Sequence, residues 1–226
     1  MTHKLILLIC AAALFAVQGC TTAITKGADR RTEGTYIEDG TISDTAAERI
    51  KKKYADKVHV NLNSYNRKML VTGEVPDEAT KADITRIVGG VQNVTAIYNE
   101  LAIGPVSSLS SRTSDAITTS NVSLRLRDSG KDLRAGRIEV VTENGVVYLL
   151  GTVAQREADA AVEVARTTGG VRKVVRVFEI VSEAEIKRLV RHATGRSEAG
   201  DAAMLADTAR WIARVPAPSR ADRLHI

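Results

Sequence analysis

One pattern of apolar and polar residues occurs twice along this chain, and it constrains the fold more than any other feature. Apolar residues dominate 58–62 and 69–75 in the first copy, and 138–142 and 146–153 in the second. Two such runs with a short polar turn between them are typical of a β-hairpin. The second turn is Asn144-Gly145, which suits the two positive φ angles of a type I′ turn. The sequence therefore predicts two hairpins.

Each hairpin is followed by a helical stretch, a pair of glycines and a closing strand. Apolar residues recur at helical spacing in both copies, at Ala158, Ala161, Val162 and Ala165 and at Ile84, Ile87 and Val88. The glycine pairs at 169–170 and 89–90 end these helices. The residues that follow, 171–181 and 91–103, predict a third strand in each copy.

Each copy also has a candidate leading helix. In the first, Ala47, Ile50 and Tyr54 predict a helix over 45–54, capped by Ser43 or Asp44. The second is predicted over 115–129, with Ile117 and Leu124 on one face, although Val122, Leu124 and Leu126 alternate as in a strand. Each copy then reads αββαβ, a three-stranded mixed sheet with two helices on one face, in an α+β fold.

The first twenty residues are typical of an export signal. The apolar run over 5–17 follows Lys4 and is too short to span the roughly 30 Å of a bilayer core as a helix. It ends in Val17-Gln18-Gly19-Cys20, which resembles the lipobox of bacterial lipoproteins. The resemblance implies that residues 1–19 are removed and that Cys20 carries lipid. The alternative is an ordinary secreted protein with Cys20 as a free thiol.

Lipidation has consequences for location. Three acyl chains, as the resemblance implies, anchor a protein to a membrane stably. Thr21 stands where Asp would retain such a protein in the inner membrane, which implies the outer membrane with the protein facing the periplasm. Residues 20–43, rich in Thr, Gly and charged residues, are predicted to be a tether with an r.m.s. span of roughly 25 Å. Cys10 lies in the removed segment, so no internal disulfide is expected.

The order of hairpin, Gly-x-Val, helix, Gly-Gly-Val and closing strand resembles the BON domain, most closely at 142–151 and 169–174. Two such domains behind a lipobox resemble the dual-BON outer-membrane lipoproteins of the DolP type. The domains are placed at 44–103 and 113–181, with a linker at 104–112 and a helical tail at 182–226. The resemblance implies a non-enzymatic protein that binds anionic phospholipid, such as phosphatidylglycerol or cardiolipin, and supports outer-membrane integrity.

The same resemblance places the lipid site on the leading helix of the second domain. Where lipid-binding members carry an aromatic residue, this chain has Ala116 beside Ile117. Between Arg125 and Arg137 there are five basic and two acidic residues, a local charge of 5 − 2 = +3. The predicted lipid-binding residues are Ala116, Ile117, Leu124, Arg125, Arg127, Lys131 and Arg134. The alternative is a solvated charged face with no ligand.

Composition argues against other functions. The formal charge of +5 is mild, and two Phe, five Tyr and one Trp offer few stacking surfaces for nucleic acid. His59, His192 and His225 are far apart without metal-ligand spacing, so we expect satisfied or solvent-facing histidines and no metal. The serines within 104–112 fit a linker, and the chain has neither a P-loop nor a Rossmann fingerprint. No catalytic residue and no cofactor are predicted.

The tail carries two predicted helices, over 182–193 and over 201–215. The second has Trp211 beside its apolar face and stops at Pro216. It could lie at a membrane interface or dock on a partner protein; the alternative is a helix that folds back on its own domain or is frayed. For the whole chain we expect a lipid-anchored module that engages anionic headgroups. The alternative is an adaptor that docks envelope proteins, such as the β-barrel assembly machinery, with the lipid only as an anchor.

Overall fold

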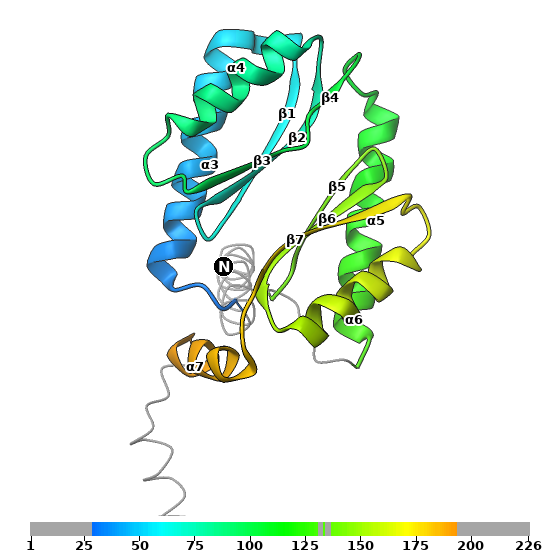
Figure 1. Cartoon of the computed structure of the whole chain (residues 1–226). Coiled ribbons are helices and arrows are strands. Elements are labelled where there is room, and N and C mark those ends of the chain that lie inside the picture. The colour runs from blue at the N-terminus through cyan, green and yellow to red at the C-terminus, as the bar shows by residue number, and fades with distance from the viewer. Residues whose placement is uncertain (1–28, 131–132, 134–136, 194–226) are drawn as a thin grey trace, which may run out of the picture.

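The computed structural model describes residues 29–130, 133 and 137–193 (Figure 1). The first repeat comprises α3 (Glu33–Tyr54), a short 3-10 helix (Ala55–Lys57), β1 (His59–Tyr65), β2 (Lys68–Val75), α4 (Glu78–Gly89), β3 (Ala96–Asn99) and β4 (Ala102–Ile103). The second comprises α5 (Leu109–Asp128), β5 (Glu139–Glu143), β6 (Val146–Val153), α6 (Gln155–Arg166) and β7 (Lys173–Ile180). Helix α7 (Glu183–Ala193) follows. The signal segment, Cys20 and the predicted helix over 201–215 lie outside the described residues.

The two sheets have the same topology, which confirms the predicted αββαβ repeat. In each, the central strand pairs antiparallel with the first strand and parallel with the last, in the orders β1-β2-β3 and β5-β6-β7. In the first sheet, β3 and β4 pair with successive parts of β2, so they act as one interrupted edge strand. Along the described part of the chain, no helix combines the length and apolar character needed to cross a bilayer.

Both hairpins turn through two residues with positive φ. Asn144 and Gly145 have φ of 49° and 72°, which confirms the predicted I′-type geometry. Asn66 and Arg67, with φ of 51° and 63°, have the same signs in the first hairpin, without a glycine. The two turns are therefore structural counterparts.

Helix α3 begins at Glu33 rather than near residue 45, so the prediction of a tether over 20–43 was wrong for residues 33–43. Thr32 caps the helix by accepting a hydrogen bond from the Thr35 amide. The buried side chains are Asp39, Ile42, Ala46 and Ile50. Their spacing is helical, but the charged Asp39 occupies one of the buried positions. The apolar pattern alone therefore does not reveal that residues 33–43 are helical.

Helix α5 confirms the predicted second leading helix but starts at Leu109, so residues 109–112 of the predicted linker are helical. Ser108 caps it by accepting a hydrogen bond from the Ser111 amide. Its buried side chains, Asp115, Thr118, Val122 and Leu126, again include a carboxylate.

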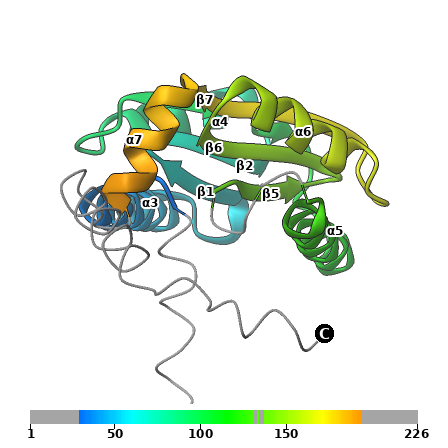
Figure 2. The same ribbon diagram turned by 90° about the horizontal axis from the view of Figure 1, so that it is seen from below.

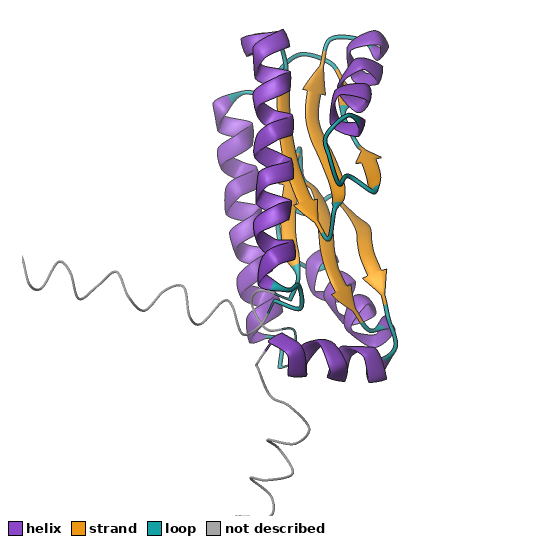
Figure 3. Cartoon of the chain, turned by 90° about the vertical axis from the view of Figure 1, so that its left-hand side faces the viewer, coloured by secondary structure: helices purple, strands orange, loops and turns teal. Residues whose placement is uncertain are grey.

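The two domains pack with their sheets face to face, and their helices form the outer layers (Figure 2). Successive residues of β2 point to opposite sides: Met69 packs under α3 and α4, whereas Leu70 packs against the second domain. The buried cluster between the sheets consists of Tyr65, Leu70, Tyr148, Leu150 and Val177. Helix α7 crosses one end of the molecule (Figure 3).

Candidate functional site

The outward face of α5 carries exposed apolar side chains. Leu109, Ile117 and Leu124 are 78%, 57% and 46% exposed. At about 100° per residue, they lie on the side of the helix opposite its buried residues. Ala116 is also exposed and lies beside this face. We define the outward face of α5 as Leu109, Ala116, Ile117, Leu124 and Arg127.

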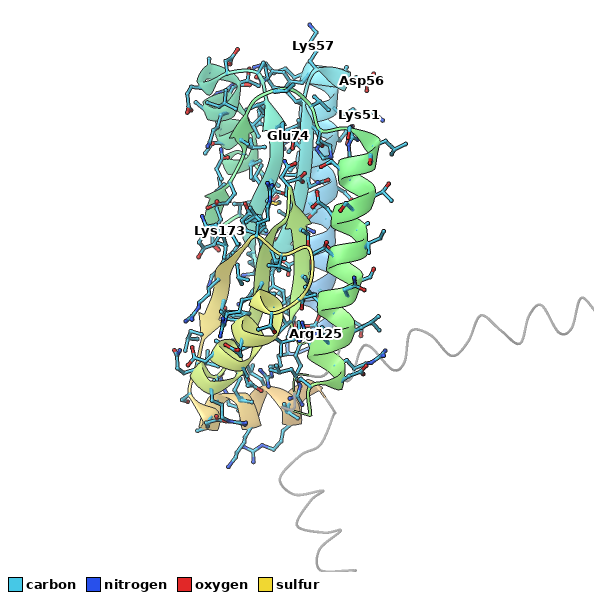
Figure 4. The ribbon with its side chains drawn as sticks, turned by 90° about the vertical axis from the view of Figure 1, so that its right-hand side faces the viewer. Lys51, Asp56, Lys57, Glu74, Arg125 and Lys173 are labelled. Carbon is cyan, nitrogen blue, oxygen red and sulfur yellow. The ribbon has the colours of Figure 1, made fainter. Side chains whose placement is uncertain are left out.

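The two described arginines at the end of α5 have different contacts. Arg125 donates hydrogen bonds to Thr168 Oγ1 at 2.8 Å and Thr167 Oγ1 at 3.2 Å, which ties α5 to the end of α6. Arg127 pairs with its neighbour Asp128 at 3.0 Å, and both side chains are more than half exposed. An exposed pair of this kind contributes little to stability, so Arg127 can exchange its partner readily. Arg125, labelled in Figure 4, is therefore a structural residue as well as a basic one.

The structure therefore brings five predicted lipid-binding residues together on one helix: Ala116, Ile117, Leu124, Arg125 and Arg127. Lys131, Arg134 and the predicted lipidation site Cys20 lie outside the described residues. Arg137 was counted in the basic segment, but its Nη1 lies 3.6 Å from Glu157 Oε1 and its side chain is largely buried. Its charge faces a carboxylate within the protein.

The segment just before α3 is fixed to the second domain, which the sequence did not indicate. Arg30 donates to both carboxylate oxygens of Glu157, at 2.8 and 2.7 Å, and to the carbonyl of Thr152 at 2.8 Å. Both side chains of the pair are at most 2% exposed. Burial alone would raise the pKa of Glu157, but the hydrogen bonds from Arg30 and the Ala154 amide outweigh it and lower that pKa.

This ion pair places the entry of the chain near the basic end of α5. Glu157, in the first turn of α6, faces both Arg30 and Arg137. Helix α5 ends, and α7 lies, at this same end of the molecule (Figure 1). A basic residue in a polar segment carries no sequence signal for such a contact, because its partner is 127 positions away.

A polar cluster lies between the domains, far along α5 from Arg125 (Figure 4). His59 Nδ1 lies 3.0 Å from Glu74 Oε2 and 3.8 Å from Glu143 Oε1. Among the described residues these three side chains have ligand atoms close enough together to hold a metal ion. Sequence spacing could not reveal the cluster, because Glu143 comes from the other domain.

Comparison with known proteins agrees with this architecture. The BON domain family matches residues 38–105 and 114–182, which together are more than half of the chain. Outer membrane lipoprotein DolP of Haemophilus influenzae is 35% identical over 173 residues, covering 72% of this chain and 89% of that protein. The 21 kDa hemolysin of Actinobacillus pleuropneumoniae is 31% identical over 159 residues, covering 70% of this chain and 81% of the relative.

Among solved structures, the chain is similar to CdsD, a structural protein of the type III secretion system of Chlamydia trachomatis. The match covers 68% of this chain and 96% of the CdsD chain. The identity is 14% and the TM-score is 0.24.

Proposed function

The chain belongs to the BON domain family as a DolP-type protein with two BON domains, and from this premise we propose that it is a non-enzymatic outer-membrane lipoprotein that binds anionic phospholipid. It faces the periplasm, is anchored through Cys20, and helps to maintain the integrity of the outer membrane. The lipid-binding surface is the outward face of α5. The DolP relative, which is named an outer membrane lipoprotein, supports the location.

The observation that carries the proposal is the set of apolar side chains on the outward face of α5. Ile117 and Leu124 are about half exposed on a helix whose opposite side is packed, so they are available to a membrane. Full burial of an exposed side chain of this size is worth about 1.5–3 kcal/mol, so burying the exposed half of each contributes roughly half of that. A cation near an anionic surface adds about 1 kcal/mol, which Arg127 can supply.

The anchored chain end brings this surface toward the bilayer. Arg30 holds the chain against the second domain, so only residues 21–28 separate Cys20 from the first described residue, Asp29. Eight residues reach at most about 30 Å even when fully extended. A free tether of residues 20–43 would reach about 80 Å when fully extended, so the shorter segment restrains the basic end of α5 closer to the anchor.

Vesicle flotation tests the lipid-binding surface. A chain starting at Thr21, which lacks the anchor, should float with phosphatidylglycerol vesicles, and less so with phosphatidylcholine vesicles or in high salt. Ile117→Ser, Leu124→Ser and Arg127→Glu should each lower the bound fraction severalfold. Arg125→Glu is a poor choice, because it also breaks the contact with Thr167 and Thr168.

Two matched controls are available on the other domain. Ile37→Ser changes an isoleucine that is 61% exposed on α3, and Arg86→Glu changes an exposed arginine that pairs with Asp83 on α4. Both should float like the unaltered chain. Equal flotation with neutral and anionic vesicles, or equal losses in all variants, would contradict the proposal and favour the adaptor function.

The anchor is tested separately. Cys20→Ala should release the full chain from the membrane fraction, because the covalent acyl chains are lost. Fractionation and intact mass spectrometry of the unaltered and Cys20→Ala chains measure this. An unmodified Cys20 in the mature protein, or a Cys20→Ala chain that stays in the membrane fraction at high salt, would contradict the lipidation.

A further inference from the structure

We propose that the interface between the two domains binds one divalent transition-metal cation, with His59, Glu74 and Glu143 as its ligands and Zn²⁺ as the best match. These side chains are separate from the lipid-binding surface and lie far from Arg125 at the end of α5 (Figure 4). His59 lies on β1 and Glu74 on β2 of the first domain, whereas Glu143 ends β5 of the second. A cation bound here would join the domains.

The ligand atoms lie near the spacing that a metal requires, and the shortest separation, between His59 and Glu74, is a hydrogen bond in the absence of an ion. His59 Nδ1 is 3.0 Å from Glu74 Oε2 and 3.8 Å from Glu143 Oε1, and all three atoms lie within 4.8 Å of one another. Ligands about 2.0–2.1 Å from a tetrahedral Zn²⁺ are about 3.4 Å apart. Small side-chain movements therefore suffice to coordinate the ion.

Neutral groups position both carboxylates. Glu74 accepts hydrogen bonds from the Ser107 amide at 3.1 Å and from the Asn144 side chain. Glu143 Oε2 accepts from Asn61 Nδ2 at 2.6 Å, which leaves Oε1 directed to the histidine side. The bonds from Asn144 and Asn61 fall on the oxygens turned away from His59, Glu74 Oε1 and Glu143 Oε2, and contacts of this kind orient carboxylate ligands in metal sites. The Ser107 amide bonds Glu74 Oε2 itself.

The cluster has an excess of negative charge. The side chains of Glu74 and Glu143 are 5% and 7% exposed, and the buried Asp115 lies nearby, bonded to the amides of Asn144 and Gly145. Arg112 lies at the same cavity but donates to the carbonyl of Ser107. Three carboxylates therefore face one arginine and one histidine, and a divalent cation would offset the difference.

The pKa values of the two glutamates agree with this charge distribution. Burial raises the pKa of Glu143, and the charges of Glu74 and Asp115 raise it further. Burial acts on Glu74 in the same direction, but hydrogen bonds from Ser107, His59 and Asn144 lower its pKa. The hydrogen bond from Asn61 and the charge of His59 act on the pKa of Glu143 in the opposite direction.

A cavity of about 390 Å³ gives access to the cluster. His59 and Glu143 lie in its wall, together with Asp115, Ala116 and Thr119 of α5. A cation with three protein ligands would complete its coordination with water from this side. One imidazole and two carboxylates suit Zn²⁺ better than Ca²⁺ or Mg²⁺, which prefer oxygen ligands alone.

Calorimetric titration of Zn²⁺ tests the site. The full-length lipoprotein is purified in detergent without a histidine tag, stripped with a chelator, and titrated. We expect one tight equivalent per chain. Glu143→Gln and His59→Ala should each weaken binding by about tenfold or more.

Glu139→Gln is the matched control. Glu139 is on the same strand, and it also accepts a bond from a β1 asparagine, Asn63, but it lies outside the cluster. This variant should bind like the unaltered chain, and so should a His192→Ala, His225→Ala double variant of the tail. Zn²⁺ should also raise the melting temperature of the unaltered chain but not of the Glu143→Gln chain.

The opposite results overturn the site. Absence of saturable Zn²⁺ binding would mean that protons, and not a metal ion, offset the negative charge of the cluster. Unchanged affinity in Glu143→Gln or His59→Ala, or loss of the tight equivalent in the tail variant, would place the ion elsewhere. If circular dichroism shows that His59→Ala does not fold, Glu143→Gln decides, since an amide keeps the shape of the carboxylate and its hydrogen-bonding oxygen.

Discussion

A buried aspartate performs the same role in both domains. Asp39 on α3 accepts hydrogen bonds from the amides of Asn66 and Arg67, at 2.8 and 2.7 Å. Asp115 on α5 accepts from the amides of Asn144 and Gly145, at 2.9 and 2.8 Å. In each case a carboxylate on the leading helix accepts hydrogen bonds from the amides of both turn residues that have positive φ. The leading helix and the hairpin turn of each repeat are thus joined through one side chain.

Replacing this carboxylate should be costly. Asp39→Ala leaves the buried Ser64 hydroxyl and two partly buried turn amides without their acceptor, and an unpaired buried group costs about 1–3 kcal/mol. We expect a loss of about 3 kcal/mol or more in the free energy of unfolding, measured by urea denaturation. Asp44→Ala, at an exposed position of the same helix, should change it by less than about 0.5 kcal/mol. Equal effects of the two changes would contradict this role.

The Arg30–Glu157 pair predicts a pH dependence. The pKa of Glu157 is lower in the folded protein than its ordinary value of 4.5, so the unfolded chain binds more protons between these two values. The pair's contribution is therefore complete above pH 4.5 and is lost as the pH falls through the folded pKa. Melting temperatures between pH 7 and pH 3 should fall less steeply for Glu157→Gln than for the unaltered chain. Parallel curves would show that this pair does not control acid stability.

At the level of elements, the patterns that depend on local chemistry were predicted well. The Asn144-Gly145 turn and the alanine-lined helix α6 follow from residue types alone. The leading helices were harder, because their buried faces hold Asp39 and Asp115 among the apolar residues. A pattern of apolar spacing cannot identify such faces, since the carboxylates are buried by contacts with turns that form only in the folded domain.

Two glycines show that the effect of a glycine-to-alanine substitution on stability depends on the element that holds the glycine. Gly73 in β2 has φ +118°, and an added Cβ would lie 2.0 Å from the carbonyl oxygen of His59. Gly73→Ala should therefore destabilise the fold by at least about 2 kcal/mol. Gly40 is exposed within α3, and a Cβ added there would meet no atom of another part of the protein within 4 Å, so Gly40→Ala should stabilise the chain by about 0.5–1 kcal/mol. Thermal unfolding of both variants measures this, and shifts of the same sign would contradict it.

For the whole molecule, the arrangement of the two domains could not be read from the repeat. The repeat predicts each domain's own core, but the second face of each sheet also carries apolar residues. Around that apolar cluster, asparagines of one domain bond to glutamates of the other, as in Asn61 with Glu143, Asn63 with Glu139 and Asn66 with Glu179. These pairings are 76 to 113 positions apart and become visible only in three dimensions. The Arg30 contact and the histidine cluster were missed for the same reason.

The face-to-face packing predicts that the domains unfold together. Leu70 and Met69 are neighbours on β2, both fully buried, but Leu70 faces the other domain and Met69 faces its own core. A buried, unpaired carboxylate is costly, so Leu70→Asp should drive the two domains apart. Separation exposes the new charge to water, and each domain keeps its own core. Calorimetry should then show two separate transitions where the unaltered chain shows one. In Met69→Asp, separation of the domains would not expose the new charge to water, so this change should unfold the first domain itself. A single unshifted transition in Leu70→Asp would mean that the sheet-to-sheet contact does not hold the domains together.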